Sequence, residues 1–285
     1  MMNRRIVAHP VFGKCLYADN GIIEVGIPLD FGLRIGHFSF LGEENVFYEH
    51  PNDTEIFTTE EGWRLRGGHR MWIAPESPKV YCPDNAPISW RVEGETLILT
   101  QQEDPRLKVI KEFRLTLEGS QLKITHRVQN TGTEPLIGAV WAISVMAPGG
   151  TETIDLQLRD GGMDHWHRIS MWDYTSLGDP RATYTRERIT LRHLPIEDKY
   201  KIGVGHPFGP VRYENGNTVF VKEFPILPEK EYPDGNVSYE AFFSKYMTEM
   251  ESLSPLHTLQ PGQWMEHQET LTLLRKEPDG KEGTL

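Results

Sequence analysis

The sequence predicts an all-β protein, and three features of its 285 residues lead to that prediction. Short segments alternate apolar and polar residues with a period of two, which is typical of half-buried strands. The 20 prolines and 26 glycines are scattered through the whole length, so turns recur often. No segment places apolar residues at i, i+3, i+4 and i+7 over three turns, and long helices are therefore not expected. We predict an antiparallel sandwich or barrel.

The strands are expected in order along the chain. An early strand is predicted at Ile22–Ile27, and a meander begins where Trp90–Val92 and Thr96–Thr100 flank a turn centred on Gly94. The clearest hairpin joins two alternating segments, Val109–Leu117 and Leu122–Gln129. Further strands are predicted at Leu136–Met146, which reads as buried on both faces, and at Arg188–Leu191, Thr218–Phe224, Tyr239–Leu253 and Met265–Leu274.

Composition limits the domain count and the class of partner. Without a Ser/Gly/Pro-rich linker or an internal repeat, we expect one domain over residues 1–275 and a polar tail over residues 276–285. The formal charge of −11 argues against nucleic acid or an anionic membrane as partner. With no export signal and no apolar stretch of membrane-spanning length, a cytoplasmic protein is predicted. Cys15 and Cys82 read as reduced thiols, and no cofactor is expected.

A first candidate site lies in the segment from Arg66 to Glu76. Arg66 and Arg70 supply donors for hydroxyl or carboxylate groups, His69 adds a titratable group, and Trp72 offers a flat apolar face for a sugar ring. The alternative is a glycine bulge at Gly67-Gly68 whose arginines point into solvent.

Two further strands place charged residues where apolar ones are expected. Lys222 shares a strand face with Phe220 and Phe224. It either points inward towards an anionic or hydroxylated partner, or it lies along the two rings with its ammonium group in solvent. Glu249 and Glu251 share one face of another strand. If that face lines a cleft, their repulsion raises one pKa and creates a candidate general base or acid; the alternative is a solvated edge.

His165 and His167 have a His-x-His spacing, which occurs among the ligands of metal sites. The pattern is short, and the remaining ligands cannot be named from the sequence. We expect both histidines to lie on the protein surface, and no metal ligand is predicted.

These motifs resemble those of a known superfamily. Arg66-Gly67-Gly68 with Trp72 and Pro75 resembles a segment of hexose-6-phosphate 1-epimerases, and residues 128–136 resemble a strand turn of mutarotase-like proteins. Glu249 and Glu251, followed by the turn at residues 259–263, are similar to the superfamily's catalytic-glutamate strand. The resemblance implies a galactose-mutarotase-like β-supersandwich whose concave sheet holds a sugar.

A closer likeness is to a bacterial family of unknown function built on that fold. Its features resemble residues 68–76, 172–175, 179–181, 201–203, 221–222, 232–235 and 249–256. Through these motifs, Lys201 and Asp234 join the expected substrate-binding residues.

Trp141 departs from the epimerase pattern. The corresponding segment of those enzymes carries the histidine that protonates the ring oxygen, whereas an indole cannot shuttle a proton. His69 is the nearest substitute acid by motif, because imidazole titrates near neutral pH.

The sequence thus predicts an enzyme of epimerase or mutarotase type that acts on a sugar, sugar acid or sugar phosphate. Glu249 or Glu251 is the expected base and His69 the expected acid. The expected substrate-binding residues are Arg66, Arg70, Trp72, Trp141, Lys201, Lys222 and Asp234. The alternatives are a non-catalytic carbohydrate-binding protein, in which Trp72 and Trp141 stack the ring, and metal-assisted chemistry through His165 and His167.

Overall fold

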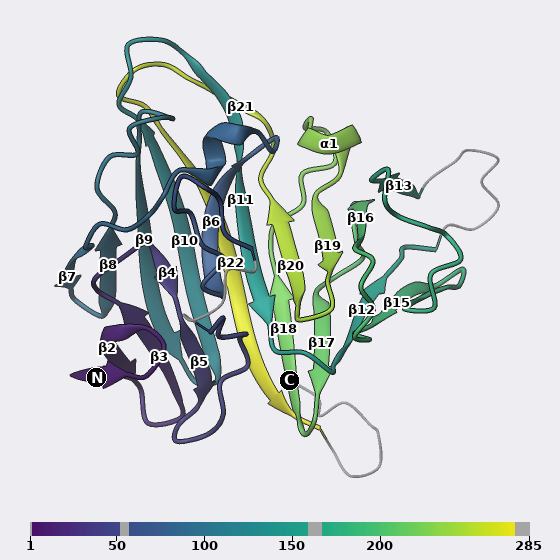
Figure 1. Cartoon of the computed structure of the whole chain (residues 1–285), viewed down its shortest axis with the longest axis horizontal. Helices are drawn as coiled ribbons and strands as arrows, with labels where there is room; N and C mark the ends of the chain where they lie inside the picture. The colour runs from purple at the N-terminus through teal and green to yellow at the C-terminus, as the bar shows by residue number, and fades with distance from the viewer. Residues whose placement is uncertain (1, 52–56, 159–166, 277–285) are drawn as a thin grey trace.

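The computed structural model describes residues 2–51, 57–158 and 167–276, which form three antiparallel sheets (Figure 1). The prediction of an antiparallel all-β fold is confirmed. The four-stranded sheet has the order β1 (Asn3–His9), β2 (Gly13–Asp19), β3 (Ile23–Pro28) and β5 (His37–Phe40).

The two large sheets mix strands from both halves of the chain. The ten-stranded sheet has the order β14 (Ala182–Tyr184), β15 (Arg188–Arg192), β12 (Thr151–Asp155), β17 (Val211–Asn215), β18 (Thr218–Glu223), β22 (Trp264–Arg275), β10 (Gln121–Asn130), β9 (Val109–Glu118), β8 (Thr96–Thr100) and β7 (Ser89–Glu93). The eight-stranded sheet has the order β13 (Arg168–Met171), β16 (Tyr200–Gly205), β19 (Tyr239–Phe243), β20 (Thr248–Leu253), β11 (Leu136–Met146), β6 (Gly68–Ala74) and β4 (Arg34–Ile35), while β21 (His257–Leu259) pairs with β11.

Helical structure in the described residues is limited to a 3₁₀ turn at Pro78–Tyr81 and the short α1 at Pro233–Asn236. Among these residues, no helix is long and apolar enough to cross a membrane. The single domain predicted over residues 1–275 stays a prediction. At the predicted tail, the Lys276 backbone N–H still donates to the Asn217 carbonyl at 3.0 Å, and residues 277–285 lie outside the described residues.

Most predicted strands are present within one or two residues, but one is wrong in extent. The segment Tyr239–Leu253 is two strands, β19 and β20, joined by a tight turn. The turn forms because the Ser244 backbone N–H donates to the Met247 carbonyl, while the Ser244 hydroxyl accepts from the Met247 backbone N–H at 3.3 Å. The run Leu136–Met146 is the predicted buried strand, placed between β20 and β6.

Strand alternation gives the eight-stranded sheet two apolar faces. Its inner face packs against the ten-stranded sheet in the main core, to which it contributes Met71, Val140 and Met250. The opposite face, here called the outer face, carries a second apolar cluster that includes Trp72 and Trp141. Because neighbouring residues of a strand point to opposite faces, this alternation decides which polar residues of each strand can share a site.

Candidate functional site

A cavity of ≈ 240 Å³ lies over the outer face of the eight-stranded sheet, and we refer to it as the outer pocket. It is lined by Phe57, Trp63, Leu65, Arg70, Trp72, Glu76, Tyr81, Trp141, Trp172, Tyr174, Lys199, Lys201, Phe242, Met247 and Glu249. The walls are rich in aromatic side chains, and a few charged groups converge among them, as is typical of small-molecule sites.

A larger hollow of ≈ 680 Å³ lies elsewhere, along residues 42–46 and 215–218. It contains none of the predicted catalytic or substrate-binding residues. Its charged lining includes the ion pair between Glu43 and Arg275, and both of these side chains are more than two-fifths exposed. Since exposed ion pairs are weak and carry little specificity, the outer pocket is the better candidate site.

The outer pocket brings together five of the predicted residues. Arg70 and Trp72 come from β6, Trp141 from β11, Glu249 from β20 and Lys201 from β16. Trp72 is paired with Trp141 across β6 and β11, and their rings meet edge to face with centroids 5.5 Å apart. The strand register therefore places both indoles in the wall of one cavity.

Arg70 and Glu249 form an ion pair in the pocket. Arg70 Nη1 donates to Glu249 Oε1 at 3.0 Å, and the guanidinium lies 4.6 Å from the centre of the Trp72 ring. Burial raises the pKa of the Glu249 carboxyl, the nearby Glu251 raises it further, and Arg70 opposes both. Glu249 is thus a carboxylate at the cavity surface whose proton affinity is higher than that of an ordinary glutamate.

Lys201 is held by two carboxylates on neighbouring strands. Its Nζ lies 2.7 Å from Glu240 Oε2 and 3.0 Å from Glu251 Oε2. Burial by itself would lower the pKa of Lys201, but the two carboxylates outweigh it and raise the pKa. Burial also raises the pKa of Glu240 well above its ordinary value, so this carboxyl holds its proton to higher pH.

Trp141 takes part in the same network. Its indole N–H donates to Glu251 Oε2 at 2.6 Å, and Lys201 Nζ lies 4.6 Å from the Trp141 ring and 4.7 Å from the Trp172 ring. Glu251 is fully buried, whereas the Glu249 side chain is 10% exposed. Of the two candidate bases, Glu249 is the one that lines the pocket, while Glu251 holds Trp141 and Lys201 in place.

Two predicted binding residues lie at the periphery. The Arg66 guanidinium stacks 3.8 Å from the Phe31 ring centre and donates to Asn85 Oδ1 at 2.7 Å, outside the pocket lining. Asp234 does not line the pocket either. Burial raises its pKa, and its hydrogen bond to Glu240 opposes that rise, so Asp234 is linked to Lys201 of the pocket through Glu240.

The structure does not bring His69 or Lys222 to the outer pocket. His69 neighbours Arg70 in β6 and therefore points to the opposite face, into the space between the two large sheets, where it is fully buried. Lys222 reaches the same space from β18, and its Nζ lies 2.8 Å from Glu269 Oε1. Neither residue can contact a molecule in the outer pocket, so the acid role expected of His69 has no support in the fold.

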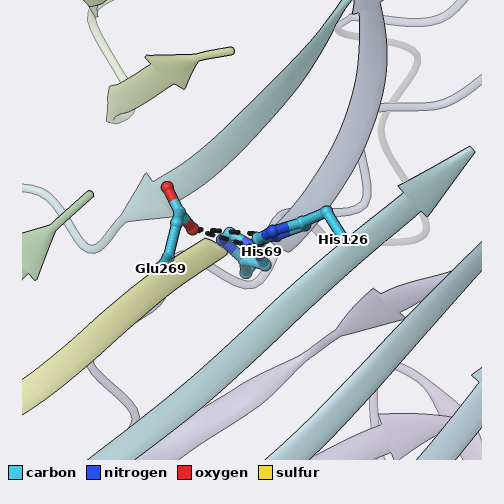
Figure 2. Close-up of side chains that lie close together, drawn as sticks. All are labelled: His69, His126 and Glu269. Carbon is cyan, nitrogen blue, oxygen red and sulfur yellow. Dashed lines mark hydrogen bonds and ion pairs between the residues drawn. The ribbon is translucent and has the colours of Figure 1, made fainter. Parts of the chain in front are cut away.

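His69 and Lys222 belong to a polar cluster between the sheets, part of which Figure 2 shows. His69 Nε2 and His126 Nε2 are 2.7 Å apart, and each lies within 3.7 Å of Glu269 Oε2. His126 Nδ1 faces the His267 carbonyl at 3.1 Å, so it carries a proton. In the neutral ring His126 Nε2 then accepts, and His69 Nε2 donates.

These three side chains could in principle hold a metal ion, because their ligand atoms all lie within 4.8 Å of one another. The hydrogen bond and the ion pair that these side chains already make argue against metal binding. The proton between the two imidazoles occupies the lone pair that a metal would need, and the Lys222 ammonium on Glu269 repels a second cation. Of the histidines considered as ligands from the sequence, His165 lies outside the described residues and His167 is exposed.

Acid should destabilise the fold through this cluster. Burial is the main cause that lowers the pKa of His126 and His267 to about 3, below their ordinary 6.5. Below pH 6.5 these histidines therefore bind protons in the unfolded chain but not in the folded chain. Each such histidine lowers the free energy of unfolding by about 1.4 kcal/mol for each pH unit. Glu152 acts in the opposite direction, because burial raises its pKa to about 8.

Comparison of the wild type with His267→Gln isolates one histidine from these opposing groups. Glutamine can keep the hydrogen bond to Ser252, which lies 2.7 Å from His267 Nε2. We expect the difference in free energy of unfolding between the wild type and His267→Gln to change by about 1.4 kcal/mol per pH unit between roughly pH 6 and 4, as measured by urea denaturation. Parallel pH profiles for the two proteins would contradict a neutral buried His267.

Several lining residues were not predicted as site residues. Trp172, Tyr174 and Glu76 lie in segments that the family resemblance had marked, so that resemblance was an available signal. Glu240 was missed because the hairpin turn between β19 and β20 was not recognised. With that turn in place, alternation alone puts Glu240 and Phe242 on the outer face.

Comparison with known proteins establishes the fold. No protein-family model and no curated protein matches the sequence. A galactose mutarotase-like protein from Lactobacillus casei superposes with a TM-score of 0.62 at 11% identity, covering 91% of this chain and 100% of that one. A galactose mutarotase-like protein from Clostridium acetobutylicum gives 0.57 at 12% identity, covering 96% and 98%.

A TPR-domain containing protein from Parabacteroides distasonis is also similar, with a TM-score of 0.61 at 12% identity over 91% of this chain. The chain spans only 47% of that longer protein. The predicted galactose-mutarotase-like β-supersandwich is thereby confirmed as the fold, and at these identities the likeness extends to the fold alone.

Proposed function

We propose that the outer pocket binds the ring of a sugar and that the protein is an enzyme of epimerase or mutarotase type. The observation that carries this proposal is Glu249, a carboxylate at the cavity surface beside the indoles of Trp72 and Trp141. Flat indole faces suit the apolar face of a sugar ring, and the carboxylate supplies the base that an anomeric hydroxyl requires. The fold shared with galactose mutarotase-like proteins adds support by analogy.

Glu249 acts as the general base in this proposal, and Glu251 acts as a positioning residue. Only Glu249 lines the cavity, whereas both the Trp141 indole and the Lys201 ammonium hold Glu251 Oε2. A raised pKa makes the Glu249 carboxylate a stronger base than an ordinary glutamate. Burial and catalytic strength are thus linked at this residue.

Lys201 replaces the expected imidazole as the donor to the ring oxygen. It lines the pocket against the Trp141 ring, and Trp141 stands at the position where the epimerase pattern has its histidine. A raised pKa keeps the ammonium charged. It can still protonate an alkoxide, because alcohols are weaker acids than ammonium groups.

The proposed reaction balances with these two groups. Glu249 removes the proton of the anomeric hydroxyl, the C1–O5 bond breaks, and its electron pair goes to O5, which takes a proton from Lys201. The resulting aldehyde turns about the C1–C2 bond. Ring closure on the other face returns both protons, so the enzyme is regenerated without a cofactor.

The substrate class proposed is a sugar that carries an acidic or phosphate group. Arg70 and Lys201 are both paired with glutamates of the protein, so they are suited to orient hydroxyl groups of the ring. Lys199 is different, because it is exposed and lines the pocket near the Phe57 ring. We assign Lys199 to bind the acidic or phosphate group of the sugar.

Saturation-transfer NMR tests the proposed activity. Irradiation of one anomeric proton is expected to transfer saturation to the other anomer faster than the uncatalysed rate for at least one hexuronic acid or hexose 6-phosphate. Glucose and galactose serve as the neutral comparison and should exchange more slowly. If the sugars bind, as shown by tryptophan fluorescence, but none exchanges faster than the uncatalysed rate, the non-catalytic carbohydrate-binding alternative replaces the enzyme.

A further inference from the structure

Strand β1 (Asn3–His9) is an edge strand with little cover. Among the described strands it pairs with β2 alone, at the margin of the four-stranded sheet near the N-terminus in Figure 1. Six of its seven residues are exposed, and two of these are large and apolar: Ile6 is 55% exposed and Val7 39%. Natural proteins usually cover, charge or shorten such edges, because the unpaired backbone groups invite another strand. Strand β1 carries two charges, at Arg4 and Arg5, but it is neither covered nor short.

The sequence of β1 complements itself. If two copies pair antiparallel about a two-fold axis so that all seven residues overlap, Ile6 faces Ile6 of the second copy. Arg5 then faces Val7, and Arg4 faces Ala8, so no arginine faces another arginine. Like charges directly opposite each other would be destabilising, and this register avoids them while placing the apolar residue on the axis.

We propose that β1 is a dimerisation edge at which a second copy of this chain extends the four-stranded sheet across a two-fold axis. Both copies contribute the same seven residues, as an isologous interface requires. A strand edge of this length buries less than the roughly 1,600 Å² of a standard interface, so the dimer should be weak and concentration-dependent. The proposal is independent of the function assigned to the outer pocket.

Paired cysteine variants test the register. In the proposed dimer the two copies of residue 6 are directly opposite, about 5 Å apart between Cα atoms, which is within disulfide range. The two copies of residue 8 are four residues out of register, about 13 Å apart along the strands. Ile6→Cys should therefore give a covalent dimer under mild oxidation, and Ala8→Cys, also at an exposed position of the same strand, should not. The native Cys15 and Cys82 are buried and should not interfere.

Light scattering after gel filtration completes the test. The wild type should approach twice the mass of the 32.7 kDa chain as its concentration rises. Ile6→Lys should remain monomeric because it places two ammonium groups on the axis, while Ile22→Lys, a matched change at an exposed turn of the same sheet, should behave like the wild type. A wild type that is monomeric at every concentration, or equal cross-linking of the two cysteine variants, would overturn the proposal.

Discussion

Glu249→Gln is expected to reduce turnover by at least about 100-fold while sugar affinity changes only a few-fold. The amide keeps the shape of the side chain and its hydrogen bond with Arg70 Nη1, which now lies 3.0 Å from Glu249 Oε1, but it cannot accept a proton. Anomer exchange by NMR and affinity by calorimetric titration separate the two effects. Glu134→Gln, an exposed change away from the pocket, is the matched control.

The pH profile of the wild type adds a second readout for the same residue. Only the ionised carboxylate can act as base, and burial raises its pKa above the ordinary 4.5. Turnover should therefore fall as the pH is lowered through that raised pKa. Any activity left in Glu249→Gln should lack this acid limb; a variant that retains full turnover and the same limb would show that another group is the base.

Lys222→Met is expected to lower the free energy of unfolding by about 3–5 kcal/mol, because it leaves Glu269 buried without its cation. The ammonium lies 2.8 Å from Glu269 Oε1 and donates to the carbonyls of Ala142 and Met250 at 3.0 and 3.1 Å. It thus ties the ten-stranded sheet to the eight-stranded one. Urea denaturation measures the loss.

The double variant Lys222→Met/Glu269→Gln is the control for that prediction. Removing the unpaired carboxylate should recover part of the lost stability, so the two changes should not add. If the single variant does not fold, recovery of folded protein in the double variant reports the same pairing. Additive losses, or a single variant within about 1 kcal/mol of the wild type, would mean that Lys222 is not paired as described.

The fold was predictable because its signals are local. Period-two alternation identified the Val109–Gln129 hairpin and the buried strand Leu136–Met146 within one or two residues. The turn inside Tyr239–Leu253 was missed because Ser244 and its neighbours lack the glycine, asparagine or proline that usually marks a turn. Its recognition would have placed Glu240 on the same face as Phe242 and Glu251.

The site was predictable only in part, because the pairing of strands that lie far apart in the chain does not follow from the local sequence. Glu249 and Trp72 were placed together through the family resemblance, and the structure brings them to one cavity. His69 was grouped with Arg70 because the two are adjacent in the chain. Adjacent residues of a strand point to opposite faces, and burial between the sheets then separates His69 from the pocket.

A crystal structure with a bound sugar tests the central claim most directly. The ligand should be the hexuronic acid or hexose 6-phosphate with the fastest anomer exchange. We predict that its ring lies against the indoles of Trp72 and Trp141, with the anomeric hydroxyl within about 3 Å of a Glu249 carboxylate oxygen and the ring oxygen towards Lys201. A sugar bound in the hollow along residues 42–46, or one in the outer pocket with its anomeric carbon turned away from Glu249, would contradict the account.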